Sequence, residues 1–445
     1  MSTQETDSKD PTSHWVAEDR RYVWHPYTQH FTAPEAIPVE RAEGVYLYTS
    51  DGQRILDGIS SWWVNIHGHS HPRLNRALRE QADRFAQVIF AGFTHQPAVR
   101  LAAQLVQRTP ANLTRAFFSD NGSTAVEVAL KMAYQCWRNR GEFKRNLFVA
   151  FEHAYHGDTF GAMAAGGVEV FHSEYSGLFF EVRRARVRQS QPRRVDSPEA
   201  SRPAEELEAI LEREGHRVAA VIMEPMVQAA GGMIVWPVEF LRHVREVTRR
   251  HDIPLIADEV FTGFGRTGKM FACQHGPIEP DILCLSKALT GGYLPLAVTL
   301  ASEDIYESFL SEDRRKTFFH GHSFTGNALA CAVALESLTL LDETKGLDRV
   351  MELEGLFTKR LEQLKSLPVV EEVRGMGALG VVELSTQGES GYLDERGPKL
   401  AQAFLERGIL LRPLGNVLYF LPPYVITNEE AHSVFDAIEE VLAGT

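Results

Sequence analysis

Short apolar segments alternate with amphipathic stretches through the middle of the chain. The apolar segments lie at residues 115–118, 147–150, 218–223, 254–257 and 282–285. Such alternation is typical of βαβ units, in which each strand is followed by a helix that covers the sheet. The pattern therefore predicts an α/β fold with a mainly parallel sheet.

The two ends of the chain carry other patterns. The turn-forming residues 50–52 separate apolar residues on either side, which predicts a β-hairpin. Apolar positions at helical spacing begin near residue 74 and return near residue 99. After residue 327 the pattern predicts two helices and then two strands, at 329–341, 347–364, 381–384 and 417–420.

These patterns divide the chain into four parts. Residues 1–14 are polar and form an expected flexible tail, and residues 15–73 are expected to contribute to a small domain and to the functional site. A large domain is expected over 74–330 and a small α+β domain over 331–445. The segment 183–203 is rich in Arg, Ser and Pro without a period, so we expect a long surface loop there.

Composition and charge exclude several classes of protein. The 445 residues are 44% hydrophobic and 24% charged, which excludes collagen-like, disordered and disulfide-rich chains. Lys and Arg number 46 against 59 Asp and Glu, so the net charge is −13. A negative chain repels phosphate backbones and anionic lipids, so we expect neither nucleic acid nor a membrane as partner, despite six arginines at 183–194.

The cysteines and the N-terminus indicate the compartment. Cys136, Cys273, Cys284 and Cys331 are scattered, which fits neither a zinc ribbon nor a disulfide framework. The N-terminus has no apolar targeting core, and no stretch reaches the roughly 18 apolar residues of a membrane helix. We therefore expect a cytoplasmic protein.

Three features carry candidate chemistry. Asp258 ends a buried strand, at the edge of an open α/β sheet where ligands bind. Lys287 follows the next apolar segment, and partial burial there would free its amine as a nucleophile. Residues 119–124, Ser-Asp-Asn-Gly-Ser-Thr, open a predicted helix, whose free N–H groups and dipole bind anions.

Each feature alone has an ordinary explanation. A strand-end Asp can cap a helix, a lysine is usually solvated, and Gly-Ser often only starts a helix. Together they supply the three groups that pyridoxal phosphate requires: an amine for a Schiff base, an anion site for the phosphate, and a carboxylate that keeps the pyridine nitrogen protonated.

A series of motifs carries a family resemblance. They are Glu-Pro at 224–225 before a Gly-Gly pair, Ile-Ala-Asp-Glu-Val at 256–260, Gly-Phe-Gly-Arg-Thr-Gly-Lys at 263–269, Ser-Lys-Ala-Leu-Thr-Gly-Gly at 286–292 and His-Gly-His-Ser-Phe-Thr-Gly-Asn at 320–327. They resemble the class III, or ω, aminotransferases over about residues 22–424. The resemblance implies pyridoxal 5′-phosphate as cofactor and the type I fold of pyridoxal-phosphate-dependent transferases, with a large, mainly parallel domain and a smaller α+β domain formed by the chain ends.

Further motifs narrow the resemblance within that family. They are Trp-His-Pro-Tyr-Thr at 24–28, Ser-Ser-Trp-Trp at 60–63, Tyr-His-Gly-Asp-Thr-Phe-Gly at 155–161 and Leu-Arg-Pro-Leu-Gly at 411–415. They resemble the members that act in biotin synthesis. The implied activity is transamination of 8-amino-7-oxononanoate to 7,8-diaminononanoate, with S-adenosyl-L-methionine as amino donor.

The resemblance implies a role for each cofactor-site residue. Lys287 is the Schiff-base lysine, and its freed amine carries the proton during catalysis, which agrees with lysine chemistry. Asp258 holds the pyridine N–H, and Gly122 and Ser123 bind the phosphate. Tyr155 covers one ring face by offset stacking.

The resemblance also implies a substrate pocket. Tyr27 is expected to act in catalysis beside this pocket, and Arg412 to grip a substrate carboxylate bidentately. We further hypothesise that the aromatic faces attract the positive sulfonium of the donor. The expected substrate-binding residues are Trp62, Trp63, Tyr155, Gly321, Arg412 and Tyr419.

The segment Gly321-His322-Ser323 is expected to act across a subunit boundary. In the family the matching segment reaches the phosphate of the neighbouring subunit, so the resemblance implies a homodimer with shared active sites. Close relatives often carry Pro-Thr where this chain has His322 and Ser323. The hydroxyl of Ser323 keeps a phosphate hydrogen bond possible.

Several alternatives stay open at this point. Some relatives use lysine as donor, and other class III enzymes act on a diamine, ornithine or γ-aminobutyrate. His67, His69 and His71 alternate as metal ligands on a strand would, but Gly68 and Pro72 favour a loop, and we expect no metal. A non-catalytic pyridoxal-binding protein is the last alternative, and the retained lysine, carboxylate and phosphate groups argue against it.

Overall fold

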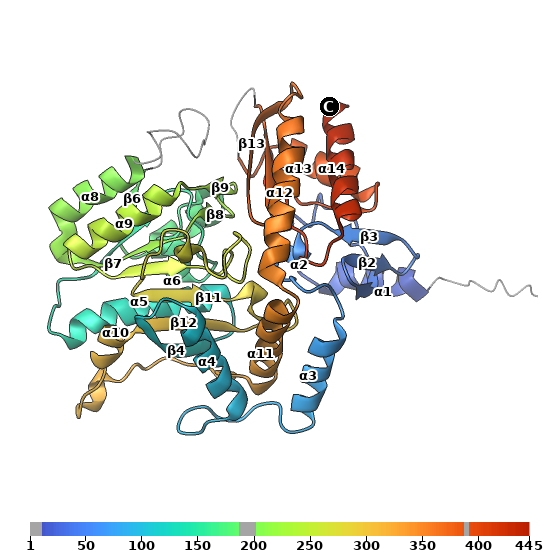
Figure 1. The fold of residues 1–445 in the computed structure, drawn as a ribbon. Coiled ribbons are helices and arrows are strands. Elements are labelled where there is room, and N and C mark those ends of the chain that lie inside the picture. Colours follow the sequence, from blue (N-terminus) through green and yellow to red (C-terminus); the bar gives the residue numbers. More distant parts are fainter. Residues whose placement is uncertain (1–10, 187–201, 387–390, 445) are drawn as a thin grey trace, which may run out of the picture.

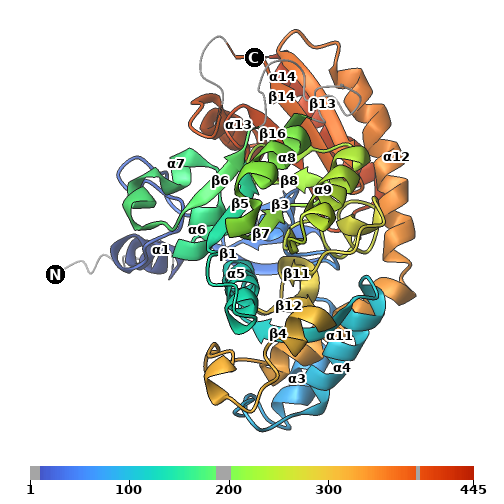
Figure 2. The ribbon, with the colours of Figure 1, turned by 90° about the vertical axis from the view of Figure 1, so that its left-hand side faces the viewer.

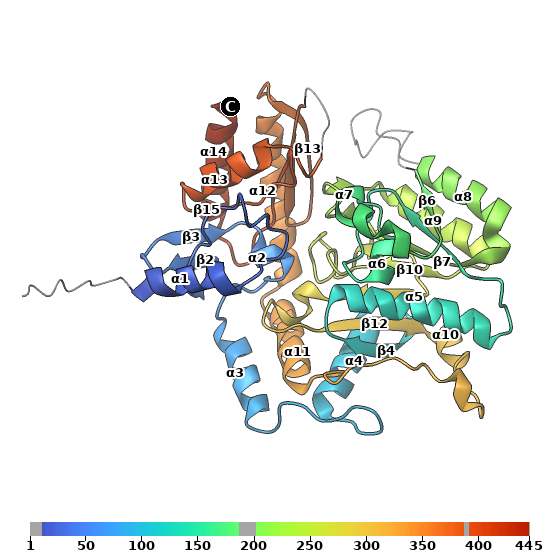
Figure 3. The ribbon, with the colours of Figure 1, turned by 180° about the vertical axis from the view of Figure 1, so that it is seen from behind.

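The computed structural model describes residues 11–186, 202–386 and 391–444. In Figures 1 and 3 a large sheet with its helices lies on one side, and the two chain ends, blue and red, lie together on the other. Most of the expected tail, residues 1–10, lies outside the described residues, and a helix begins at Pro11. The layers of helix and sheet confirm the expected α/β class.

Seven strands form the large sheet. They are β4 (Leu113–Ser119), β5 (Leu147–Phe151), β6 (Val182–Ala185), β7 (Val218–Met223), β10 (Leu255–Asp258), β11 (Ile282–Leu285) and β12 (Ala297–Ser302). Their order across the sheet is β4-β12-β11-β10-β7-β5-β6. Only β12 runs antiparallel to its neighbours among these strands, so the expected mainly parallel sheet is confirmed.

Side chains of the central strands alternate between two apolar layers. Ile222 and Ile256 point to the face covered by helix α5 (Gly122–Asn139). Their neighbours Val221 and Leu255 join the cluster on the other face. Because successive strand residues point to opposite faces, a strand covered on both sides is apolar throughout, which produced the continuous apolar segments. In Figure 2 the second face carries α4 (Gln96–Arg108), α8 (Arg202–Glu214) and α9 (Val238–Arg250).

The two ends of the chain share one sheet. Strand β15 (Ile409–Leu410) pairs in parallel with β3 (Arg54–Asp57). On its other side β3 pairs with β2 (Tyr46–Thr49), which confirms the expected hairpin, and β1 (Val39–Glu43) completes this sheet. A second sheet and three helices complete the α+β body: β13 (Val370–Met376), β14 (Leu379–Leu384), β16 (Val417–Phe420), α12 (Gly346–Leu364), α13 (Arg396–Leu405) and α14 (Asn428–Ala443).

The remaining elements pack around these two bodies. Helix α11 (Ala328–Glu343) packs on α3 (Pro72–Ala82) and α4, and it confirms the helix expected at 329–341. Among the described residues no helix has the length and apolar character needed to cross a bilayer. The other short elements are α1 (Pro11–Tyr22), α2 (Ser60–Trp63), α6 (Phe160–Ala165), α7 (Glu169–His172), α10 (Glu303–Glu307), β8 (Val227–Gln228) and β9 (Ile234–Val235).

The surface loop expected at 183–203 is wrong at both ends. The edge strand β6 occupies its start and α8 begins at Arg202, while residues 187–201 lie outside the described residues. In β6, Arg183 pairs with Glu214 at 2.9 Å, and Arg184 donates to the carbonyl of Gly166 at 2.8 Å. Charged side chains are common on edge strands, where they discourage further pairing, and they hid this strand from the apolar pattern.

Candidate active site

The polar residues at the ends of three strands of the large sheet lie at one edge of that sheet. Asp258 ends β10, Lys287 follows β11, and Glu224 follows β7. Because these strands are parallel, their carboxyl ends meet at the same edge of the sheet. Helix α5 starts at this edge too, directly after β4. Residues far apart in the sequence therefore meet in one place.

A cavity of about 640 Å³ lies at this edge. Six of the residues predicted from the sequence line it: Trp63, Gly122, Ser123, Tyr155, Asp258 and Lys287. The structure thus brings together the amine, the carboxylate and the helix N-terminus. The other polar lining residues include Asp120, Asn121, His156, Asp158, Thr159, Glu224, Ser286 and Thr290.

Lys287 has a strained backbone and a partly desolvated amine. Its φ of 47° lies in the left-handed region, which is unfavourable for an L residue. Its Nζ lies 4.4 Å from the ring centroid of Trp63. Burial disfavours the ammonium and lowers the pKa of Lys287 to about 8, although Asp258 and Glu224 oppose the shift. A useful fraction of this amine is therefore unprotonated and nucleophilic near neutral pH.

Asp258 is held in place by two hydrogen bonds. Its Oδ2 lies 2.7 Å from Nδ1 of His156, and its Oδ1 accepts the backbone N–H of Val260 at 3.1 Å. Both side chains of the Asp258–His156 pair are buried. Because an ionised carboxylate only accepts, Nδ1 of His156 carries the hydrogen. Each carboxylate oxygen keeps a further lone pair for a donor in the cavity.

Glu224 is a second buried carboxyl group at the cavity. Burial raises its pKa to about 7; His156 opposes this rise, and Asp258 adds to it. One oxygen accepts the backbone N–H of Tyr155 at 2.9 Å, and the other accepts that of Ala229 at 3.0 Å. Glu224 therefore ties the loop after β5 to the segment after β7.

The start of α5 has the features of an anion site. Asn121 caps the helix, because its Oδ1 accepts the N–H of Thr124 at 3.1 Å. Gly122 and Ser123 come first in the helix, where N–H groups have no carbonyl one turn earlier, and the positive end of the helix dipole lies there. A Cβ at Gly122 would lie 2.5 Å from Cγ1 of Val260, so a larger residue there would force the side chain of Val260 to move. Such an end suits a phosphate group.

Tyr27, in the N-terminal segment, contacts two of the residues that line this cavity, although it does not line the cavity itself. Its hydroxyl donates to both carboxylate oxygens of Asp158, at 2.9 and 2.8 Å, and lies 3.1 Å from the hydroxyl of Tyr155. Burial raises the pKa of Tyr27 and of Tyr155, so both are neutral hydroxyls at physiological pH. The structure thus joins two predicted residues, Tyr27 and Tyr155, by a direct contact between their hydroxyls.

Trp62 and Trp63 face different neighbours. Nε1 of the buried Trp63 donates to the hydroxyl of Tyr419 at 3.0 Å. Trp62 is 37% exposed and makes an edge-to-face contact with Tyr27 at 5.5 Å. The guanidinium carbon of Arg412 lies 4.7 Å from the ring centroid of Trp62. The face that Arg412 covers is therefore not open to a sulfonium.

The predicted residues Gly321, His322 and Ser323 do not line this cavity. They lie in a segment before α11, where Nε2 of Gln87 donates to the carbonyl of Ser323 at 3.0 Å. The neighbouring side chain of Phe324 is 62% exposed. Within one subunit the structure keeps this segment apart from the residues that surround Lys287.

The alternating histidines do not converge. Nε2 of His67 lies 3.0 Å from the hydroxyl of Ser337, and Nε2 of His69 lies 2.9 Å from the buried carboxylate of Asp57. His71 is the N-cap of α3. Each histidine therefore has a separate structural role in this part of the fold.

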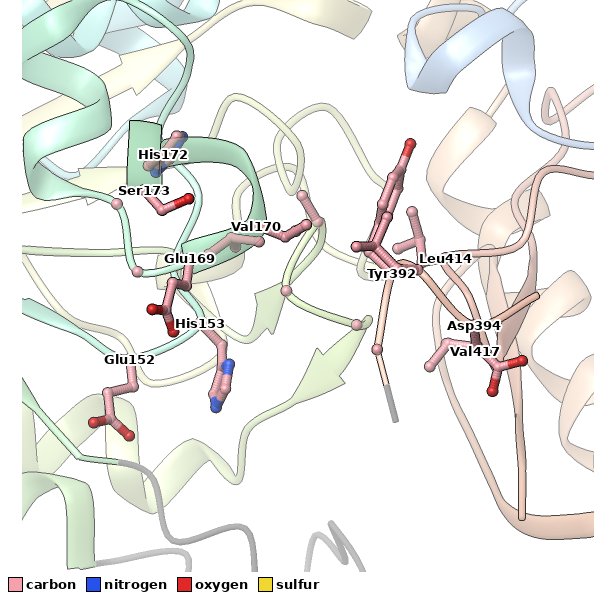
Figure 4. A pocket seen from close by; sticks show the side chains of 18 of the residues that line it. Glu152, His153, Glu169, Val170, His172, Ser173, Tyr392, Asp394, Leu414 and Val417 are labelled. Atoms are coloured by element: carbon pink, nitrogen blue, oxygen red, sulfur yellow. The ribbon is translucent and has the colours of Figure 1, made fainter. Parts of the chain in front are cut away.

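A larger cavity of about 1170 Å³ opens between the sheet body and the chain-end body. In Figure 4, His172 lies on one side of it, and Tyr392 and Leu414 lie on the other. Phe171 contacts both Tyr392, at 4.8 Å, and Tyr27, at 5.4 Å, so a chain of aromatic rings connects the two cavities. None of the site residues predicted from the sequence lines this larger cavity.

Sequence reasoning gave no role to His156 or Glu224. Both belong to the motifs quoted above, but a sequence motif does not show which residues the side chains of His156 and Glu224 contact in the folded protein. The available signal was position, because each lies shortly after the end of a buried strand, as Asp258 and Lys287 do.

Comparison with known proteins agrees with this geometry. The model of the family "Aminotransferase class-III" matches residues 27–442. A relative from Synechococcus elongatus is 46% identical over 423 residues, which are 95% of this chain and 98% of the relative. One from Geobacter sulfurreducens is 44% identical over 433 residues, 95% of this chain and 96% of the relative. Both are named adenosylmethionine-8-amino-7-oxononanoate aminotransferase.

Solved structures show the same similarity. The crystal structure of an adenosylmethionine-8-amino-7-oxononanoate aminotransferase from Methanocaldococcus jannaschii matches with a TM-score of 0.91 and 38% identity, covering 97% of this chain and 99% of that one. An (S)-enantioselective ω-transaminase from Thermomicrobium roseum matches with a TM-score of 0.91 and 32% identity, covering 97% of this chain and 98% of that one. The chain therefore belongs to the class III aminotransferase family.

Proposed function

We propose that this aminotransferase transfers an amino group to 8-amino-7-oxononanoate, which gives 7,8-diaminononanoate for biotin synthesis, and that S-adenosyl-L-methionine is the donor. One observation carries the proposal. Relatives 41–46% identical to this chain, over at least 94% of its length, bear the name of that enzyme. The site supports it with an amine, two carboxyl groups and an arginine near aromatic walls.

Pyridoxal 5′-phosphate, the general cofactor of the family, fits the residues of the smaller cavity. The N–H groups of Gly122 and Ser123 would bind its phosphate, Asp258 would hold its ring nitrogen, and Tyr155 would cover one ring face. Lys287 would hold its aldehyde carbon. When bound, the cofactor supplies a carbon that carries the amino group and a ring that accepts electrons. The fit rests on the cavity that Gly122, Ser123, Asp258 and Lys287 line together, on the N–H groups at the start of α5, and on the free lone pairs of Asp258.

Lys287 would also move the proton during the reaction. Its pKa of about 8 lets the amine both take up and release a proton near neutral pH. Tyr27 would assist, because its hydroxyl hydrogen is directed to Asp158. The oxygen of Tyr27 then accepts from the hydroxyl of Tyr155, and its second lone pair would accept a hydrogen bond from the amino group of the substrate.

Arg412 would bind the carboxylate that both substrates carry. Its guanidinium lies over the ring of Trp62, and its N–H groups would bind a carboxylate in the bidentate manner typical of arginine. Charged hydrogen bonds of this kind contribute about 1.5–3 kcal/mol each. Trp63 and Tyr419, joined by their hydrogen bond, would form the wall beside it.

A homodimer with shared active sites would explain the segment 321–323. This segment does not line the cavity around Lys287, and the side chains of Phe319 and Phe324, next to it in the sequence, are exposed. Such a patch is costly in water unless it is covered by a partner. We therefore place His322 and Ser323 at the phosphate, and Gly321 at the substrate, of the second subunit. The exposed apolar residues on this surface are Ile89, Phe93, Phe319 and Phe324.

We also place the enzyme in the cytoplasm. Cys136, Cys273, Cys284 and Cys331 are unpaired and buried. Free thiols suit a reducing compartment.

A single-turnover reaction tests the proposed function. The cofactor-loaded enzyme is mixed with S-adenosyl-L-methionine, and the loss of pyridoxal absorbance is followed. 8-Amino-7-oxononanoate is then added, and we expect the absorbance to return with formation of 7,8-diaminononanoate, as in ping-pong kinetics. A second arm uses lysine. If lysine but not S-adenosyl-L-methionine transfers its amino group, the proposed donor is wrong. If the absorbance does not return when 8-amino-7-oxononanoate is added, the proposed function is wrong.

A further inference from the structure

Four consecutive residues, of which the last lines the smaller cavity, have left-handed backbone conformations. The φ angles of Ser60, Ser61, Trp62 and Trp63 are 52°, 45°, 70° and 76°. L residues other than Asn and Asp visit this region rarely, and then as single residues. The segment is nevertheless a closed turn, because the N–H of Trp63 donates to the carbonyl of Ile59 at 2.8 Å. We call residues 60–63 the left-handed turn.

The left-handed turn carries two neighbouring tryptophans, of which Trp63 lines the smaller cavity and Trp62 lies outside it. Trp62 contacts Tyr27 and Arg412, whereas Trp63 lies against the amine of Lys287. A relaxed backbone at these positions would move both indole rings, because each side chain follows its own Cα–Cβ direction. The strained conformation therefore sets the shape of the pocket.

Asp57 anchors this turn from behind. Its Oδ1 accepts the N–H of Ser61 at 2.8 Å, and its Oδ2 accepts the hydroxyl of Ser61 at 2.7 Å. Its Oδ2 also lies 2.9 Å from Nε2 of His69. Asp57 is completely buried and lines neither of the two cavities. The hydroxyl of Ser60 adds an anchor at the carbonyl of Leu421, at 2.7 Å.

We propose that Asp57, oriented by His69, is a positioning residue that holds the left-handed turn and thereby places Trp62 and Trp63 in the substrate pocket. The proposal rests on the proposed function in one respect: that function supplies the substrate that the two tryptophans would contact. Its physical basis is that three hydrogen bonds to the buried carboxylate of Asp57 offset the free-energy cost of a left-handed conformation, which L residues otherwise avoid.

The first test compares Asp57→Ala with the wild-type holoenzyme. Amide hydrogen exchange is measured on the peptide that spans residues 57–66, and we expect roughly tenfold faster exchange in the variant. Near-ultraviolet circular dichroism reports the surroundings of the tryptophans and should change as well. In kinetics we expect KM for the keto substrate to rise about tenfold with a smaller change in kcat, because the displaced tryptophans shape the binding pocket and take no part in proton transfer.

A second substitution separates strain from a general loss of folding. Glycine adopts positive φ at no steric cost, so Ser61→Gly added to Asp57→Ala should restore slow exchange and lower KM again. Ser70→Gly is the matched control, because Ser70 is also left-handed, with φ of 54°, but lies outside the turn. It should give no rescue in the Asp57→Ala background.

Further outcomes decide the proposal. Should Asp57→Ala fail to fold, Asp57→Asn retains the size of the side chain and an acceptor for the N–H of Ser61, and intermediate exchange is expected. Unchanged exchange of residues 57–66 in both Asp57 variants would overturn the proposal, as would equal rescue by both glycines. Exchange needs no substrate, so these results stand even if the single-turnover reaction gives no transfer.

Discussion

Nδ1 of His156 lies 2.7 Å from Oδ2 of Asp258, and both side chains are buried at the carboxyl edge of the sheet. The imidazole fixes the orientation of the carboxylate that we assign to the cofactor ring nitrogen. This pair links the end of β10 to the loop after β5. It gives His156 a positioning role that its motif alone did not reveal.

His156→Phe should therefore lower kcat without preventing folding. Loss of one hydrogen bond to a charged group, about 1.5–3 kcal/mol, corresponds to a decrease of roughly 10- to 100-fold. Steady-state kinetics with both substrates would measure it. His275→Phe removes a half-buried histidine outside the cavity, which binds the carbonyl of Thr267, and serves as the control. Equal activity of His156→Phe and the wild type would contradict the assigned role.

The amine of Lys287 should control the pH dependence of cofactor uptake. An amine with a pKa near 8 is protonated below that pH and nucleophilic above it. The rate at which cofactor-free protein acquires the pyridoxal chromophore should rise from pH 7 and level off a little above pH 8, as stopped-flow absorbance would show. A rate that still climbs steeply above pH 9.5 would mean that the amine keeps the ordinary lysine pKa of about 10.4. Lys287→Ala should show no such chromophore.

Arg412→Ala should weaken substrate binding more than chemistry. Because one or two charged hydrogen bonds to the carboxylate are lost, KM for 8-amino-7-oxononanoate should rise roughly 10- to 100-fold. Thermal unfolding should change little. Arg407→Ala, at a half-exposed arginine of the same α+β body, is the matched control and should leave KM unchanged. A fall in kcat at constant KM would contradict carboxylate binding by Arg412.

Shared active sites predict complementation between two inactive variants. Lys287→Ala lacks the amine, and a His322→Asp, Ser323→Asp double variant places negative charge where we expect phosphate. After unfolding and refolding together, half of the dimers should be mixed, and each mixed dimer has one intact site. Activity should then recover to about a quarter of the wild-type value. A mixture as inactive as its components would contradict the shared site.

The sequence pattern predicts the strands that carry the site better than the contacts between side chains. The strands ending at Asp258 and preceding Lys287 are apolar throughout because helices cover both faces, so their pattern is strong. The edge strand β6 was missed because its arginines, which pair with Glu214 and with a backbone carbonyl, interrupt the apolar pattern.

Other features depend on tertiary contacts alone. The left-handed turn at 60–63 follows from the buried carboxylate of Asp57, and no local propensity predicts four such residues in succession. The partner of His156 likewise depends on the packing of β5 near β10, which no spacing along the chain encodes.

Borohydride reduction of the protein mixed with pyridoxal 5′-phosphate tests the central claim most directly. Reduction fixes the cofactor to the amine that holds it, and peptide mass spectrometry then locates the label. We predict one pyridoxyl group per chain, on Lys287, and its absence from Lys287→Ala. A label on another lysine, or none at all, would contradict the account.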